Sequence, residues 1–310
     1  MFISVVVVNW NSIDDLRDCL TSLREQTHRD LEVIVIDNGS EDGSVAMVES
    51  VFPEFRLLRQ GENLGFAEGC NRGIDAASGE WVAMLNNDAV AEADWAETLV
   101  DAASSAAPSC GMLQSLLLYK TREGIVNSAG IVLTGSGYGR DRLEGTPRAS
   151  NQEPEEIFCP TAGAAAYRMS MLREIRIPTG YFDRNHFMYY EDLDIGWRAR
   201  IAGYTATYIP RSVVHHRWHG SSDRHGDSWL RILADTNRIR TLIKNASKRF
   251  IVVHLISILN GAGRVLGTSG IRGVPAFFQA IVDSIRCRSR VSSMAKVSRH
   301  SIERRWQERP

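Results

Sequence analysis

Trp81-Val82-Ala83-Met84-Leu85-Asn86-Asn87-Asp88 is the stretch that decides the fold. An apolar run of strand length stops abruptly at two amides and a carboxylate. Because apolar residues occupy both faces of this strand, the pattern predicts burial on both sides, as in a parallel sheet covered by helices. Ligands of such sheets bind beyond the carboxyl ends of the strands. We therefore expect Asp88 at the rim of a site, although a lone Asp after a strand is usually part of a turn.

The chain before this stretch repeats the same alternation of strand and helix. Strands are predicted at 3–8, 31–36 and 55–58, and helices near 12–23, 43–51 and 67–77. Short connections between alternating strands and helices predict a doubly wound, Rossmann-like α/β sheet with helices on both faces.

Two of the earlier strands also end in polar residues. The clusters are Asn9 with Asn11, and Asp37 with Asn38. Together with the amides and carboxylate before Ala89, three polar clusters fall on the same edge of the predicted sheet. One such cluster means little, but three on one edge favour a binding site there.

The chain from about 89 to 167 is less regular. A helix is predicted near 94–106, and the Gly-rich, charged stretch 130–145 is predicted to be a loop. Within it, Gly135-Ser136-Gly137-Tyr138-Gly139 is superficially like a dinucleotide-binding loop, but the spacing and the strand-to-helix context are wrong. A GK[ST] motif is missing as well, so we exclude binding of nicotinamide cofactors and ATP.

Two later stretches carry chemistry. Three acids, Glu191, Asp192 and Asp194, follow an aromatic run at the start of a predicted helix, where negative charge is favoured. A strand is predicted at 204–209, and three histidines follow it, at positions 215, 216 and 219. Alternation along an extended chain places the first two on opposite faces, so at most one of them faces a given site. Metal binding, base stacking and loop capping all remain open for this cluster.

The chain is electrostatically divided despite a net charge of −1. From position 225 onward there are 16 Lys and Arg against 5 Asp and Glu, whereas the preceding part is acidic. We expect a first domain at 1–225, with a nucleotide-binding half at about 1–90 and an acceptor half at about 91–225, and a basic, mostly helical region at 226–310. A basic amphipathic region of this kind is suited to an anionic membrane surface. A solvated charged face is an equally open interpretation.

Five scattered cysteines without a CxxC pair argue against a disulfide framework and a zinc site. The sequence has no evident signal peptide, and no uncharged apolar run reaches the roughly 20 residues of a membrane span. We expect a cytoplasmic protein with possible peripheral contact at the inner face of the plasma membrane. The basic tail carries no RNA- or DNA-binding motif, so nucleic acid is not expected as a partner.

Several separate blocks, in order, resemble the GT-A family 2 glycosyltransferases, and within them the rhamnosyltransferase-like branch. The resemblance covers roughly residues 1–245. The blocks are Val7-Val8-Asn9-Trp10-Asn11, Val35-Ile36-Asp37-Asn38-Gly39-Ser40, Asn63-Leu64-Gly65-Phe66-Ala67 with Asn71-Arg72-Gly73, Asn86-Asn87-Asp88, Gly163-Ala164, Tyr190-Glu191-Asp192-Leu193-Asp194 with Trp197-Arg198-Ala199-Arg200, and Pro210 with His216.

The resemblance implies a GT-A fold with a C-terminal helical extension and an inverting, metal-dependent transfer from a nucleotide sugar. It implies Mg²⁺ or Mn²⁺ held by Asp88 and His216, and a catalytic base at Asp192, with Glu191 in reserve. Acids beside Asp192 can also raise its pKa. The implied nucleotide contacts are Asn9, Asn11, Asp37, Asn38, Asn63, Gly65, Asn71 and Asn87. The usual DxD motif is Asn86-Asn87-Asp88 here, so only its last acid is present.

The resemblance also favours dTDP-rhamnose as the donor, with other dTDP-, UDP- and GDP-sugars open. It implies a saccharide or lipid-linked saccharide as the acceptor and a role in cell-surface polysaccharide synthesis. Two alternatives remain. A sugar nucleotidyltransferase typically has a Gly-rich loop with Lys or Arg after the first strand, which Asn9-Trp10-Asn11 is not. A non-catalytic binder of nucleotide sugars or glycans would be marked by loss of the base or of the metal-binding acid, and both acids are present.

Overall fold

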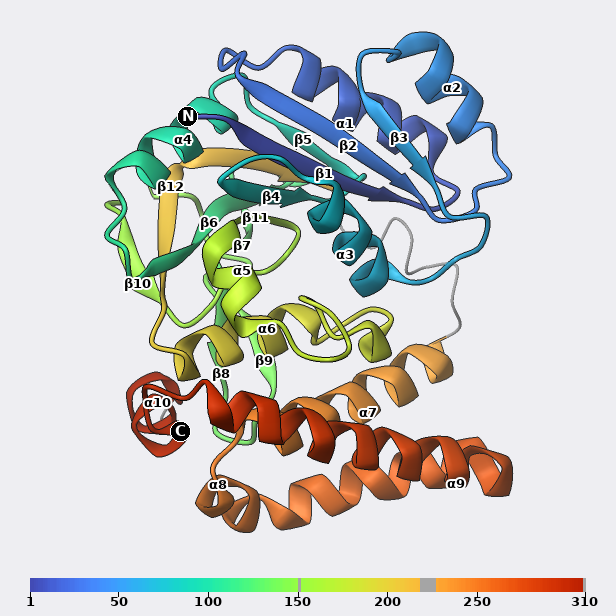
Figure 1. Ribbon diagram of the computed structural model, residues 1–310, viewed down its shortest axis with the longest axis vertical. Helices are drawn as coiled ribbons and strands as arrows, with labels where there is room; N and C mark the ends of the chain where they lie inside the picture. Colours follow the sequence, from blue (N-terminus) through green and yellow to red (C-terminus); the bar gives the residue numbers. More distant parts are fainter. Residues whose placement is uncertain (150–151, 218–226, 309–310) are drawn as a thin grey trace.

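The computed structural model describes residues 1–149, 152–217 and 227–308 (Figure 1). Its strands are β1 (Ile3–Asn9), β2 (Leu31–Asp37), β3 (Arg56–Arg59), β4 (Trp81–Leu85), β5 (Ala89–Ala91), β6 (Cys110–Tyr119), β7 (Val126–Ser128), β8 (Ile131–Leu133), β9 (Gly139–Asp141), β10 (Glu155–Ile157), β11 (Ala164–Arg168) and β12 (Thr205–His216). Its helices are α1 (Ile13–Arg24), α2 (Ser44–Val51), α3 (Phe66–Ala76), α4 (Trp95–Ser105), α5 (Met169–Ile175), η1 (Arg184–His186), α6 (Glu191–Ile201), α7 (Asp227–Asn245), α8 (Lys248–Val253), α9 (Leu255–Ser293) and α10 (Arg299–Trp306).

The main sheet is mixed, with strand order β10-β12-β6-β11-β4-β1-β2-β3. Strands β3, β2, β1 and β4 run parallel to one another, and β11 lies antiparallel between β4 and β6. The register pairs Asn9 with Asp37 at the ends of β1 and β2, so the predicted polar edge is formed.

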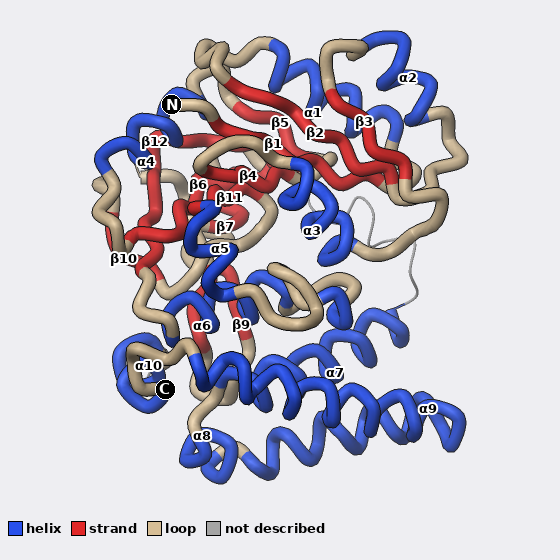
Figure 2. The backbone as a smooth tube through the Cα atoms, viewed as in Figure 1, coloured by secondary structure: helices blue, strands red, loops and turns tan. Residues whose placement is uncertain are grey.

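Helices cover both faces of this sheet, as predicted (Figure 2). The residues of β1 alternate between two cores: Val5 and Val7 belong to the core that includes residues of α1, α2 and α4, whereas Val6 and Val8 belong to the core that includes residues of α3, α5 and α6. This alternation is the two-residue period of a strand buried on both sides. The prediction of a mixed α/β sheet with helices on both faces and a C-terminal helical extension is confirmed.

The middle of the chain differs from expectation. The longest strand of that section, β6, is buried along its whole length and was not predicted. The stretch 130–145, predicted to be a loop, contains the hairpin β8–β9. Strand β12 continues past Pro210 to His216, with a register irregularity between Ile209 and Val213. Proline has no N–H for the ladder, and a bulge is where a strand tolerates it.

The C-terminal helices lie along one side of the sheet domain (Figure 1). Helix α7 packs against α6, and α9 doubles back along α7, so that both arms of α9 contact it. Arg238 of α7 donates to the hydroxyl of Ser257 on the first arm, and Arg288 of the second arm donates to the carbonyls of Ile243 and Ala246. Within the described residues, no helix combines the length and apolar character needed to cross a bilayer.

Candidate active site

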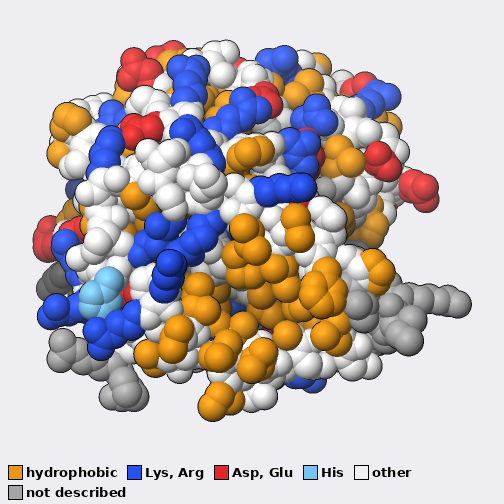
Figure 3. All heavy atoms as spheres, turned by 60° about the horizontal axis from the view of Figure 1, so that its bottom comes forward, with side chains coloured by type: hydrophobic (Ala, Val, Ile, Leu, Met, Phe, Trp, Pro, Cys, Tyr) orange, Lys and Arg blue, Asp and Glu red, His pale blue; other side chains and the backbone are white. Residues whose placement is uncertain are grey.

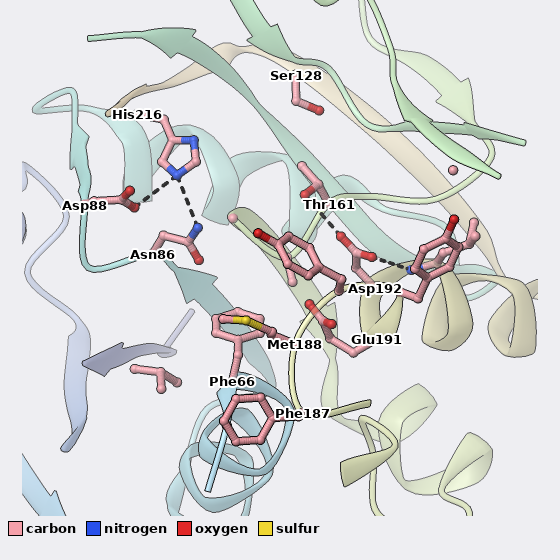
Figure 4. Close-up of a pocket in the computed structure, with 18 of the residues that line it drawn as sticks. Phe66, Asn86, Asp88, Ser128, Thr161, Phe187, Met188, Glu191, Asp192 and His216 are labelled. Atoms are coloured by element: carbon pink, nitrogen blue, oxygen red, sulfur yellow. Dashed lines mark hydrogen bonds and ion pairs between the residues drawn. The ribbon is translucent and has the colours of Figure 1, made fainter. Parts of the chain in front are cut away.

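A cavity of about 380 Å³ opens at the polar edge of the sheet. Asp88 and His216 line it on one side, and Glu191 and Asp192 line it on the other (Figure 4). These residues come from the β4–β5 connection, the end of β12 and the start of α6, so the fold brings together segments that are more than a hundred residues apart. The two acids on which the sequence interpretation rests therefore share one hollow.

Asp88 and His216 form a pair suited to a divalent cation. The Asp88 Oδ1 lies 3.0 Å from the His216 Nε2, and both side chains are nearly buried. His216 Nδ1 lies 2.8 Å from Asn127 Oδ1, so this nitrogen donates and, in the neutral ring, Nε2 carries a lone pair. The Asn86 amide also reaches Nε2, at 3.2 Å. A carboxylate oxygen and an imidazole nitrogen lie close together, and Asn127 orients the ring through its other nitrogen. This arrangement fits a metal site.

The structure separates the adjacent histidines. His215 points to the other side of β12, where its Nε2 lies 3.2 Å from Glu92, and it does not line the cavity. His216 is therefore the histidine that faces Asp88. The third histidine of the cluster, His219, lies outside the described residues.

Five of the eight residues expected to bind nucleotide line the cavity. They are Asn9, Asn38, Asn63, Gly65 and Asn87. Their side chains are held by one another and by nearby backbone: the Asn87 amide donates to Asn9 Oδ1 at 2.8 Å, and the Asn38 amide donates to the carbonyl of Gly65 at 3.1 Å. These hydrogen bonds hold the amide side chains at the rim of the cavity in fixed orientations.

The other three lie outside the cavity lining, and each has a side-chain oxygen that accepts from the backbone. Asp37 Oδ2 accepts from the backbone of Gly39 and Ser40, whereas its Oδ1 is buried without a hydrogen-bond partner, and Asn11 Oδ1 accepts from the backbone of Glu41. Asn71 Oδ1 accepts from two backbone N–H groups of the 181–182 segment, at 3.0 Å each. In this structure all three side chains shape turns and loops that support the rim.

Glu191 and Asp192 are adjacent carboxyl groups in different environments. Asp192 accepts hydrogen bonds from the Thr161 hydroxyl (3.2 Å) and the Leu193 N–H (2.7 Å). Burial raises the pKa of Asp192, and these hydrogen bonds oppose the shift. Burial and the charge of Asp192 raise the pKa of Glu191 well above its ordinary value, and Glu191 Oε2 is buried without a hydrogen-bond partner. Of the two, Glu191 is suited to hold a proton and Asp192 to hold the charge.

The polar cavity residues that were not singled out from the sequence include Asn127, Ser128, Asp141 and Thr161. Asp141, on β9, is the third carboxyl group facing the acid side of the cavity, and burial raises its pKa to about 6. These residues come from β7, β9 and the segment before β11, in the part of the chain without a readable pattern. No local sequence signal marks these residues, and only their positions in the folded structure identify them as part of the site.

The loop before α6 closes the cavity with aromatic side chains. Phe187, Tyr189 and Tyr190 all have positive φ angles, between 62° and 71°, which is uncommon for bulky residues. Such backbone strain persists where surrounding contacts over-determine it. Asn237 of α7 supplies such contacts, because its amide lies 2.7–3.0 Å from the carbonyls of His186, Met188 and Tyr189.

A second group of possible metal ligands lies behind α6, outside the cavity lining. Asp183, His186 and Asp194 offer ligand atoms within 4.8 Å of one another, and all three are buried. Lys244 of α7 bonds to both carboxylates, and Arg198 bonds to Asp194 at 2.9 Å. Two acids facing two cations already form a balanced buried network, and a dication there would meet both cations.

Comparison with known proteins agrees with this architecture. The family description "Glycosyl transferase family 2" matches residues 4–176. The N-acetylglucosaminyl-diphospho-decaprenol L-rhamnosyltransferase of Mycobacterium tuberculosis is 29% identical in an alignment of 238 positions that covers 70% of this chain and 76% of that protein. The putative glycosyltransferase EpsH of Bacillus subtilis is 26% identical over 71% of this chain and 62% of its own length.

Two solved structures share the fold. GalNAc-T7 with UDP, GalNAc and Mn²⁺ superposes with a TM-score of 0.67 at 17% identity, covering 99% of this chain, which spans 58% of that one. The mannosyltransferase PcManGT from Pyrobaculum calidifontis, with GDP-Man and Mn²⁺, gives 0.53 at 18% identity, covering 98% of this chain and 87% of that one. The fold and the site thus define a GT-A glycosyltransferase. The chain belongs to glycosyl transferase family 2.

Proposed function

We propose that this protein is an inverting, metal-dependent glycosyltransferase that moves a sugar from a nucleotide-sugar donor to a saccharide acceptor. The observation that carries the proposal is the shared cavity, with a carboxylate–imidazole pair on one wall and an ionisable carboxylate on the other. Transfer of a sugar needs both functions: stabilisation of a departing diphosphate and removal of a proton from the attacking hydroxyl.

Asp88 and His216 are the residues that would hold Mg²⁺ or Mn²⁺. Oxygen-rich ligation completed by diphosphate and water suits these ions. A bound cation would neutralise the negative charge that develops on the leaving diphosphate. The remaining work falls to the chain: the rim of Asn9, Asn38 and Asn87 would position the nucleotide beside the pair.

Asp192 would accept the proton of the acceptor hydroxyl as that hydroxyl attacks the face opposite the leaving group. One direct displacement inverts the anomeric centre, so a β-linked donor would give an α-linked product. Thr161 and the Leu193 N–H hold the carboxylate in one orientation. The proton on Glu191 would keep a second negative charge away from the reacting atoms.

The relatives support a narrower version of the proposal. One resembling enzyme is a rhamnosyltransferase whose name describes a lipid-diphosphate-linked sugar acceptor. We propose dTDP-rhamnose as the donor, a lipid-linked saccharide as the acceptor, and a place in cell-surface polysaccharide synthesis at the cytoplasmic side of the membrane. A panel of nucleotide sugars screened for Mn²⁺-dependent thermal stabilisation tests the donor. Product formation with a polyprenyl-diphosphate saccharide tests the acceptor, and binding without any transfer would favour a non-catalytic binder.

Replacing His216 with Ala tests the metal site. We expect loss of about 100-fold or more in Mn²⁺-dependent transfer, because a direct ligand is removed where even supporting residues are typically worth 10–100-fold. His215→Ala is the matched control, since this neighbour faces Glu92 and should keep near-normal activity. Calorimetric titration of the donor with and without Mn²⁺ measures the same loss in binding. Full transfer in EDTA would contradict the proposal.

Replacing Asp141 with Asn tests the acceptor side. Asp141 faces the same cavity as Asp192, and a carboxylate there can accept hydrogen bonds from sugar hydroxyls. Hydrogen bonds to a charged group are worth about 1.5–3 kcal/mol, so we expect kcat/KM for the acceptor to fall about 10–100-fold. Donor affinity should stay within twofold. A fall in donor affinity with an unchanged acceptor KM would place Asp141 on the nucleotide side instead.

A further inference from the structure

Helices α8 and α9 expose an unusual number of large apolar side chains. Eight of the twelve exposed large hydrophobic residues in the described chain lie on these two helices. They are Val252, Val253, Leu255, Ile256, Leu259, Phe278, Val282 and Ile285. Isolated exposed apolar residues are normal on a soluble protein, but a concentration of them on one element marks an interaction surface.

The spacing of these residues gives each arm of α9 an outward-facing stripe. Ile256 and Leu259 continue the helical spacing begun by Val252, and Phe278, Val282 and Ile285 repeat it on the returning arm. The opposite side of each arm packs on α7, through a small core that includes Val265 and Phe277. The stripes therefore point away from the sheet domain, and Figure 3 shows hydrophobic side chains gathered on this face.

Basic side chains border the apolar face. Lys and Arg side chains lie beside it in Figure 3. The exposed ones on α8, on the returning arm of α9 and just beyond it are Lys248, Arg249, Arg286, Arg290 and Lys296. Between positions 248 and 306 the sequence has only two acids, Asp283 and Glu303. Asp283 is paired with Arg286, and Glu303 is buried. Arg286 shares its charge with Asp283, and Lys296 pairs with Glu174 of α5 at 2.7 Å. The border of the patch therefore keeps a net positive charge that rests mainly on Lys248, Arg249 and Arg290.

We propose that the α8–α9 face binds the surface of an anionic lipid bilayer. Its apolar stripes would enter the interfacial layer, and its Lys and Arg side chains would contact lipid phosphates, which is how basic amphipathic helices bind membranes. A second copy of the chain fits this face less well, because two-fold pairing would bring the same basic border of both copies together. The apolar stripes require an apolar partner and the basic border requires an anionic one, and an anionic bilayer surface provides both.

Helix α7 lies between the α8–α9 face and the cavity and contacts both. Ala234 of α7 lines the cavity, Asn237 holds the aromatic loop, and the outer side of the same helix packs on α9. Bilayer binding would therefore act on the helix that holds the aromatic loop of the cavity. That a lipid-linked acceptor reaches this cavity from the bound membrane rests on the proposed function, whereas the binding itself does not.

Co-sedimentation of the full chain with vesicles tests the proposal. The probes are phosphatidylglycerol/phosphatidylcholine vesicles and pure phosphatidylcholine vesicles, without donor or acceptor. We expect binding to the anionic vesicles that weakens with salt, and little binding to the neutral ones. Arg286→Gln and Lys248→Gln should each weaken binding about fivefold, and Ile256→Ser with Phe278→Ser about tenfold or more. Matched controls far from the face, Arg17→Gln and Val51→Ser, should bind like the unmodified protein.

Three outcomes would overturn the proposal: no binding to anionic vesicles, binding unaffected by the α8–α9 variants, or a dimer in sedimentation velocity that Ile256→Ser dissociates. Measuring sugar transfer to a short, water-soluble acceptor tests the proposed function independently of membrane binding. The α8–α9 variants should keep that activity, because none of the replaced residues lines the cavity. Vesicle binding without any transfer would leave the membrane face in place and remove the transferase proposal.

Discussion

Asp192→Asn should reduce transfer by about three orders of magnitude while leaving donor binding intact. A positioned general base contributes about 10²–10⁴-fold, and the amide keeps the size of the side chain but cannot take a proton. The Thr161 hydroxyl can still donate to the remaining oxygen, so the site should keep its shape. Single-turnover rates and donor titration of the same variant measure the two quantities separately. Near-normal turnover would remove Asp192 from the role of base.

Glu191→Gln is the matched control, one residue away. Because burial and the charge of Asp192 raise the pKa of Glu191 well above its ordinary range, the neutral form of this side chain is favoured, and the neutral amide should keep most of the activity. If Glu191 were the base, the two variants would exchange their effects.

The pH profile supplies a further readout. Burial raises the pKa of Asp192 above the ordinary Asp value of about 3.9. As pH is lowered, activity should therefore begin to fall at a pH above that value, because the base becomes protonated.

Lys244→Met should lower the free energy of unfolding by about 3–5 kcal/mol, the usual cost of removing one partner from a buried ion pair. Lys244 is fully buried and bonds to Asp183 and Asp194, which would be left as two neighbouring buried carboxylates. Urea denaturation measures the change. The exposed Lys248→Met is the control and should change stability by less than about 0.5 kcal/mol.

The dependence on pH gives this prediction a sign. The cation of Lys244 lowers the pKa of both Asp183 and Asp194 against the effect of burial. Their contribution to stability is therefore present above the unfolded carboxyl pKa of about 3.9 and is lost as pH falls further toward the lowered values. Without Lys244 this acid-side loss should shrink, and Lys244→Met combined with Asp183→Asn should recover part of the stability. An unchanged profile in Lys244→Met would contradict the ion-pair interpretation.

The sheet edge was predictable because strand periodicity and polar strand ends are local signals. Runs such as 81–85 are apolar on both faces, and the polar residue that follows each run must lie at the edge. The direction of individual side chains was not predictable in the same way. Asp37 stands at the predicted strand end, and one of its carboxylate oxygens accepts from Gly39 and Ser40 while the other is buried without a hydrogen-bond partner.

Strand β6 shows why the middle of the chain was harder to interpret. Its Leu-rich end favours a helix by propensity, and full burial removes the alternation that identifies a half-buried strand. Its central polar residues, Gln114 and Ser115, interrupt the apolar pattern. Their partners come from distant segments: Trp95 donates to the Ser115 hydroxyl at 2.9 Å, and the side-chain Oε1 of Gln114 accepts from the Thr161 N–H at 2.7 Å. Neither partner is visible without the fold.

The contacts of the Asn237 amide with three loop carbonyls have a consequence for how related enzymes could change their substrates. Because a residue of α7 fixes the loop that carries Phe187 to Tyr190, exchanging the C-terminal helices between relatives would exchange the support of one cavity wall. Chimaeras joined just after β12 would then keep the aromatic side chains of this loop but hold them with a different helix.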